Sequence, residues 1–217
     1  MTTFEHALLG VNGAIAAGLH RRYGWQVVGL AGLVAISPDW DGLTLALGPE
    51  LFDQGHRVWG HSLFTCVLLG IALGAIDYRF DVVTRIANVL ARLLKRCGLV
   101  MPAGLGDVAW PLRSVRTAAG YVVWIAVAIA AGLSHLAADL VVSGTATLGD
   151  WHLQLLWPFS NRGWIYPHVR WGDPGMTVIF VLGMLAMYCW PRRLQLIAAT
   201  TLVGVAAYIL IRGAMAG

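Results

Sequence analysis

Residues 118–142 read AAGYVVWIAVAIAAGLSHLAADLVV, an apolar run whose single charged side chain, Asp139, lies close to its end. About 20 consecutive apolar residues are enough for a helix to cross the hydrocarbon core of a bilayer. The run is longer than that, so it predicts a transmembrane helix. A helix satisfies its own backbone hydrogen bonds, which makes it one of the few structures that lipid tolerates.

The composition of the whole chain points the same way. Of its 217 residues, 58% are hydrophobic and 12% are charged, and the mean hydropathy is +0.70. A soluble domain carries roughly 25% charged residues, so this chain cannot cover a water-facing surface. A soluble enzyme and a disordered chain are therefore excluded. The three cysteines are scattered without a CxxC pair, which argues against a zinc knuckle or a disulfide framework.

Apolar segments recur along the chain, and we expect an all-α, polytopic transmembrane helix bundle of five to six segments. The first two segments are short enough to be tilted, re-entrant or buried against their neighbours. The whole chain, 1–217, is expected to form a single integral membrane domain. The apolar segments run over 4–19, 25–36, 58–76, 118–142, 176–190 and 194–211.

The distribution of lysine and arginine predicts the orientation in the membrane. If all six segments cross, eleven of the fifteen basic residues lie on one side. The positive-inside rule assigns that side, with the loop 77–117, to the cytoplasm and puts both termini outside an inner (plasma) membrane. The basic excess then reflects topology, and nucleic acid is not expected as a partner.

Within that loop, residues 81–97 read DVVTRIANVLARLLKRC. The apolar residues recur at helical spacing, and the arginines and the lysine fall on the opposite side. This pattern predicts an amphipathic helix that lies on an anionic membrane surface. A plain connector without a regulatory role is the simpler interpretation of its purpose.

Seven ionisable residues in or beside the apolar segments are histidine or aspartate, which are ligands of zinc and similar metals. Ionisable groups near membrane depth are costly and are usually paired or functional. If the spans alternate, all of them reach the extracytoplasmic face; if only one of the first two segments crosses, they face the cytoplasm. These candidate metal ligands are His6, Asp39, Asp41, His56, His61, His135 and Asp139.

Their spacing fits coordination. His135 and Asp139 are four residues apart, so they lie on one face of a helix and can share a metal. Asp39 and Asp41 flank Trp40 in a turn, where alternate carboxylates could reach one ion or bridge two. Seven ligands exceed the need of one tetrahedral zinc, which makes a two-metal centre the natural count. One or two zinc ions are expected, with manganese as the alternative.

Each element also has a structural explanation. His6 alone could be a helix-start residue, the two aspartates could cap a turn, and His135 and Asp139 could form a buried hydrogen-bonded pair. Arg57 could hold a phosphate or pair with Asp39 or Asp41. Further alternatives are outer roles for His152 and His168 and a serine nucleophile at Ser62 or Ser134.

Four ordered motifs resemble the membrane-bound metal-dependent hydrolase family, also called the LexA-binding, inner membrane-associated hydrolase family. They are SPDWDG at 37–42, GHRVWGHSLF at 55–64, GLSHLAADLV at 132–141 and LLWPF at 155–159. The family pattern is an early His, PD-x-D-H, HRG-x-THS, SH-x-x-x-D and LLWP. The resemblance covers a metal-site core of about 4–160, leaving a C-terminal helical pair at 174–213. It implies that the seven His and Asp residues form the metal site.

The chain departs from that pattern at three places. Gly42 stands where the family often has His, Val58 and Gly60 replace the Gly and Thr of HRG-x-THS, and the link to LLWP is longer than usual. The first departure removes a ligand or proton carrier, and the second removes a hydroxyl. His152 lies in the longer link and could compensate.

The function expected from these residues is a membrane-embedded metal-dependent hydrolase of a phosphoester, with a lipid or lipid-linked substrate. Asp39 or Asp41 would take a proton from the attacking water, and Arg57 would steady the anionic substrate. Membrane lipids are the expected partners. A metal or small-solute transporter and a non-enzymatic regulatory partner are the alternatives. The interfacial mouth would be lined by Trp40, Trp59, Trp151 and Trp157.

Overall fold

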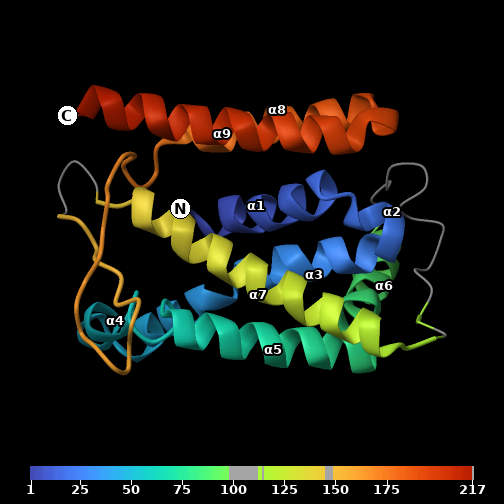
Figure 1. The fold of residues 1–217 in the computed structure, drawn as a ribbon, viewed down its shortest axis with the longest axis horizontal. Helices are drawn as coiled ribbons and strands as arrows, with labels where there is room; N and C mark the ends of the chain where they lie inside the picture. The colour runs from blue at the N-terminus through green and yellow to red at the C-terminus, as the bar shows by residue number, and fades with distance from the viewer. Residues whose placement is uncertain (98–111, 114, 145–148, 217) are drawn as a thin grey trace.

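The computed structural model describes residues 1–97, 112, 113, 115–144 and 149–216, and this part of the chain is helical (Figure 1). Its only β-type pairings are isolated bridges in the connection between α7 and α8. The elements are α1 (Thr3–Ala16), α2 (Leu19–Tyr23), α3 (Trp25–Ala35), the 3-10 helix η1 (Ser37–Leu47), α4 (Pro49–Gly55), α5 (Leu63–Phe80), α6 (Val82–Arg96), α7 (Ala118–Val141), α8 (Pro174–Cys189), the 3-10 helix η2 (Pro191–Arg193) and α9 (Leu194–Ala216).

Three stretches of the described chain are long and apolar enough to cross a membrane: α5, α7 and the segment Pro191–Met215. Two further helices, α3 and α8, are apolar but shorter. The all-α class is thus confirmed, and the first two apolar segments are short, at 14 residues in α1 and 11 in α3. The third apolar segment, expected at 58–76, is a helix only from Leu63 to Phe80. Ser62 caps its start by accepting a hydrogen bond from the Thr65 amide.

The helices pack as a bundle with one outlying pair. α7 lies against α5 and α3, and α1 lies between α3 and α9. The α8–α9 pair, red in Figure 1, runs along one edge of the bundle. Close approach depends on small residues: a Cβ added to Gly70 or Gly74 of α5 would come within 3 Å of the backbone of α7. Such contacts are how helices gain packing energy in lipid.

The amphipathic helix expected at 81–97 is present as α6. Val83 and Thr84 are buried against the bundle, whereas Ile86 and Leu90 are exposed. Buried Asp81 precedes the helix and forms an ion pair of 2.7 Å with Arg116, which ties the start of α6 to the chain before α7.

The bundle has two chemically different ends. In Figure 1, the start of α1 and the end of α7 lie at the end that carries η1 and α4, whereas α2 and α6 lie at the other end. The candidate metal ligands therefore gather at the first end. The basic residues of α2, α6 and η2 lie at the second.

Gly10 and Gly13 of α1 provide a matched test of this packing. A Cβ at Gly10 would lie 2.4 Å from the Ala31 carbonyl oxygen of α3, whereas a Cβ at Gly13 would meet nothing within 4 Å. We expect Gly10→Ala to lower the free energy of unfolding by about 1–3 kcal/mol through overpacking. Gly13→Ala should leave it unchanged or raise it by at most about 1 kcal/mol. Thermal unfolding in detergent measures both, and equal midpoints would contradict the assigned α1–α3 contact.

Candidate metal centre

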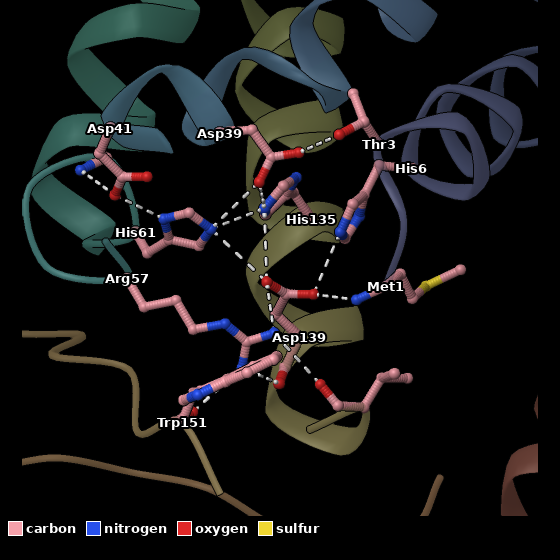
Figure 2. Close-up of polar contacts among 12 residues, drawn as sticks. Met1, Thr3, His6, Asp39, Asp41, Arg57, His61, His135, Asp139 and Trp151 are labelled. Atoms are coloured by element: carbon pink, nitrogen blue, oxygen red, sulfur yellow. Dashed lines mark hydrogen bonds and ion pairs between the residues drawn. The ribbon is translucent and has the colours of Figure 1, made fainter. Parts of the chain in front are cut away.

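The ligands predicted from the sequence come from four separate places in the chain (Figure 2). His6 lies on the first turns of α1, and Asp39 and Asp41 lie on η1. His56 and His61 lie in the connection between α4 and α5, and the last two ligands project from the end of α7. The fully buried members, with no exposed surface, are His6, Asp41, His61 and His135.

Two imidazoles and two carboxylates form the centre of the cluster. The Nε2 atoms of His61 and His135 lie 3.0 Å apart. Each of these Nε2 atoms lies 3.5 Å from Asp39 Oδ1. The distance to Asp139 Oδ2 is 3.5 Å from His61 Nε2 and 3.6 Å from His135 Nε2. Two ligands at zinc–nitrogen bond length on a tetrahedral ion are separated by about 3.3 Å. The spacing of these donor atoms therefore suits a single small ion.

The two central histidines are held in the tautomer that a metal requires. Nδ1 of His135 donates to the Ala35 carbonyl oxygen at 2.7 Å, and Nδ1 of His61 donates to Asp41 Oδ2 at 2.8 Å. A neutral imidazole that donates from Nδ1 presents a lone pair on Nε2. Both lone pairs consequently point into the cluster, with their directions set by a second layer of contacts.

Asp41 lies in that second layer. Its Oδ2 also accepts the Gly60 amide at 3.0 Å, and its Oδ1 lies 3.1 Å from His56 Nδ1. Burial works against the charged carboxylate, yet the hydrogen bonds from His56 and His61 lower the pKa of Asp41 below its ordinary value. Asp41 and His56 are thus held against each other and against His61. Although Asp39 and Asp41 are only two residues apart, Asp39 lies beside the Nε2 atoms of the central histidines and Asp41 contacts His61 from the opposite side of its ring.

The described residues contain two groups of three whose donor atoms lie within 4.8 Å of one another. One group is His61, His135 and Asp139, all buried, and the other is His6, Asp39 and His135. His6 stacks on His135 with ring centroids 3.6 Å apart, and its Nε2 lies 3.1 Å from Asp139 Oδ1. Its Nδ1 is buried without a hydrogen-bond partner, which a buried polar atom rarely tolerates.

Asp139 is the most heavily contacted carboxylate of the cluster. Besides the histidines, it pairs with the amino group of Met1 and, at 3.1 Å, with Arg57 Nη2. These contacts compensate for removing the carboxylate from water. Pairing of His135 and Asp139 on one helix face, expected from their spacing, is confirmed.

Arg57 has a different place from the one expected. It is 3% exposed and adopts a left-handed backbone with φ of 62°. Its guanidinium donates to the carbonyl oxygens of Val142 and Trp151 and lies over the Trp151 ring at 5.5 Å. Its ion pair is with Asp139, where the sequence had suggested Asp39 or Asp41. Arg57 therefore fastens Asp139 to the chain that follows α7.

The electrostatics of the cluster favour a bound positive charge. Burial opposes ionisation of Asp39, but hydrogen bonding to His61 and the nearby histidines lower its pKa to about 2. Burial likewise opposes protonation of His61, yet hydrogen bonds to Asp139, Asp39 and Asp41 raise its pKa to about 10. The carboxylates thus hold a proton on His61. A metal ion can replace that proton, because binding to a metal requires neutral imidazole.

A cavity of about 340 Å³ opens over the cluster. Asp39, Arg57, Trp151 and Trp171 are among the residues that line it. Of the tryptophans predicted for the mouth, Trp40, Trp59 and Trp157 are absent from this lining. Trp171 also lines the cavity, with its ring centroid 6.0 Å from that of Trp151, and it was missed because it lies in a connection without a motif.

The remaining candidates belong to neither group of converging donor atoms. His152 packs against Gly163, and His168 packs against Gly213. Ser62 is occupied by its contacts with Thr65, and Ser134 Oγ donates to the Ala131 carbonyl. The two serines thus make local helix contacts, which gives no support to a serine nucleophile.

The comparison with known families covers the whole molecule. Residues 1–217 match the model of the family described as YdjM inner membrane protein. The chain belongs to this family. That description places family members in the inner membrane and states no activity. No curated protein and no solved structure matches the chain.

Membership in an inner-membrane family agrees with the apolar helices and establishes the protein as a membrane protein. The structure explains one of the departures from the motifs of the resembled family and shows the surroundings of another. A Cβ at Gly60 would lie 2.0 Å from the Pro38 carbonyl oxygen, so a threonine there would require the backbone to shift. At Gly42, which lines the cavity, a Cβ would meet nothing within 4 Å.

These two glycines allow a paired test of the site. Gly60→Ala should displace Pro38 and Asp41, loosening His61 and lowering the unfolding free energy by about 1–3 kcal/mol. Gly42→Ala projects into open space and should leave the protein unchanged. Thermal unfolding and metal content of the two variants, measured side by side, check this. A stable, fully metal-loaded Gly60→Ala protein would contradict the tight contact between Gly60 and Pro38 of η1.

Proposed function

We propose that this protein is a membrane-embedded, metal-dependent hydrolase of phosphoesters. One observation carries the proposal: two buried histidines present their Nε2 atoms 3.0 Å apart, each oriented from behind by an acceptor, with carboxylates of Asp39 and Asp139 beside them. A structural hydrogen-bonded pair needs one donor and one acceptor nitrogen. Because both Nδ1 atoms already donate, the two facing Nε2 atoms have to share one cation: either the proton that the carboxylates hold on His61 or a metal ion that replaces it.

His61, His135 and Asp139 would hold the ion, with Asp39 and His6 adjacent. Imidazole nitrogen and carboxylate oxygen are donors that suit zinc, and manganese is the alternative. We favour one ion over two. Both groups of three depend on His135, whose Nδ1 is committed to the Ala35 carbonyl. Its remaining nitrogen can bind one ion.

Zinc in such a site supplies Lewis-acid chemistry, lowering the pKa of water and polarising a phosphoryl oxygen. We assign to Asp39 the role of accepting the proton of the attacking water, and what supports this is that its side chain is 23% exposed and lines the cavity. Both oxygens of Asp41 are occupied, so Asp41 instead orients His61. Arg57 positions Asp139, and Trp151 and Trp171 form a wall of the cavity.

A lipid or lipid-linked phosphoester is the substrate class that fits the location. The cavity opens at the end of the bundle, beside helices that are long enough to span lipid. We further propose that six segments cross and that the site faces the extracytoplasmic side. What supports this is the gathering of basic residues at the opposite end, which the positive-inside rule assigns to the cytoplasm.

Metal content tests the site directly. Purified in detergent without chelators, the wild-type protein should contain about one zinc per chain by elemental mass spectrometry. His135→Ala should lose it, since no other side chain can replace the shared nitrogen. His168→Ala, which removes a histidine outside the cluster, is the matched control and should keep it. Normal zinc in a folded His135→Ala protein would sink the assignment, and two ions per wild-type chain would refute the single-ion count.

Turnover tests the chemistry. With bis(p-nitrophenyl) phosphate as the probe, zinc-loaded wild-type protein should release nitrophenolate. Asp39→Asn keeps an oxygen near the ion but removes the proton acceptor, so the rate should fall about 100-fold or more with zinc retained. His135→Ala should lose zinc and turnover together, which controls for contaminating phosphatases. Full activity in Asp39→Asn would show that another group takes the proton.

A further inference from the structure

A second large cavity lies at the basic end of the bundle, far from the candidate metal centre. Its volume is about 590 Å³, and it lies between α2, α3, the end of α5 and the start of α7. None of the candidate metal ligands lines it. Its lining includes Arg22, Tyr23, Gln26, Tyr78, Arg113 and Trp124.

The two charged side chains in this lining are both arginines. Arg113 is fixed in place, with its guanidinium 4.2 Å from the Trp124 ring centroid and 4.9 Å from that of Tyr78. It pairs with Asp77 at 3.3 Å and Asp81 at 3.4 Å. Both carboxylates are 2% exposed and lie behind the arginine, outside the lining. The wall of the cavity therefore carries a guanidinium whose charge Asp77 and Asp81 offset from behind.

Arg22 supplies positive charge that no carboxylate of the described residues offsets. It lies over the Tyr23 ring at 5.4 Å, and it forms no ion pair with any acidic residue that the structure describes. A guanidinium with unused donors, in the same cavity as a second one, suits a phosphate group, which can accept paired hydrogen bonds. The aromatic rings and the apolar side chains of Leu112 and Val115 make the remaining wall amphipathic.

The level of the cavity in the membrane follows from α6. This helix exposes Ile86, Leu90 and Leu93 while its polar positions carry arginine and lysine, so it belongs at the boundary of headgroups and acyl chains. It starts immediately after Asp81, one turn beyond the cavity-lining Tyr78. Along α7, the exposed side chain of Val122 follows the cavity-lining residues in the direction of the apolar middle of the bundle.

We propose that this cavity binds the headgroup of an anionic phospholipid. Arg22 and Arg113 contact the phosphate, the rings of Tyr78 and Trp124 enclose the headgroup, and the acyl chains follow the exposed face of α7. Basic pockets between helices on the cytoplasmic side are suited to such headgroups. This site does not depend on the proposed hydrolase activity.

The test measures lipid binding to the full chain in neutral detergent. Dioctanoyl phosphatidylglycerol, titrated with native mass spectrometry as the readout, should bind at least about tenfold more tightly than dioctanoyl phosphatidylcholine. Inorganic phosphate, the other source of the same chemistry, should bind far more weakly. Comparable binding of phosphatidylcholine would overturn the charge argument, and comparable binding of inorganic phosphate would overturn the assignment to lipid.

Two matched pairs of variants locate the site. Arg22→Gln should weaken phosphatidylglycerol binding about tenfold, whereas Arg21→Gln removes the same charge one residue away, outside the lining, and should leave it within about twofold. Ala119→Trp fills the cavity without changing charge and should also weaken binding; Ala118→Trp, an exposed neighbour outside the lining, should not. Equal losses within either pair would mean general surface attraction and would overturn the proposal.

Discussion

The structure of the candidate site depends on one constraint: a carboxylate buried in an apolar bundle must be paired. Asp139 lies at the end of the longest described apolar helix and is almost fully buried. It is contacted by a histidine of α1, the amino group of Met1 and an arginine that precedes α5. Leaving such a charge unpaired would cost several kcal/mol. Satisfying it draws the ends of separate helices to one point.

Buried carboxylates are also paired with arginines at the opposite end of the bundle, but there the arginines are the exposed partners. Asp77 and Asp81 are as deeply buried as Asp139, and they are paired with Arg113 and Arg116. There the arginines lie at the surface and the carboxylates lie behind them, so the outward-facing charge is positive. At the metal end Arg57 pairs with Asp139, and the carboxylates of Asp39 and Asp139 line the cavity together with Arg57 and His56. The two ends therefore expose different charged groups.

Much of the fold followed from local patterns in the sequence. The long apolar runs predicted helices because a segment of about 20 apolar residues in lipid has to satisfy its own backbone hydrogen bonds. The amphipathic period of 81–97 located α6 for the same kind of reason. The predicted start of the third apolar segment, at residue 58, was wrong, because apolar content cannot distinguish a helix from the loop at 56–62 that precedes α5. That loop is held by Gly60, whose amide reaches Asp41, a contact between residues distant in sequence.

The sequence by itself determined the membrane bundle, the separation of basic and His/Asp ends, and the pairing of His135 with Asp139. These depend on composition and on the fixed geometry of a helix turn. Only the tertiary structure decided which donors face one another. It turned Asp41 toward His61 and His56, gave Asp39 to the cavity, and paired Arg57 with Asp139. The side chains of a turn or loop have no fixed period, so their directions are set by the helices that pack around them.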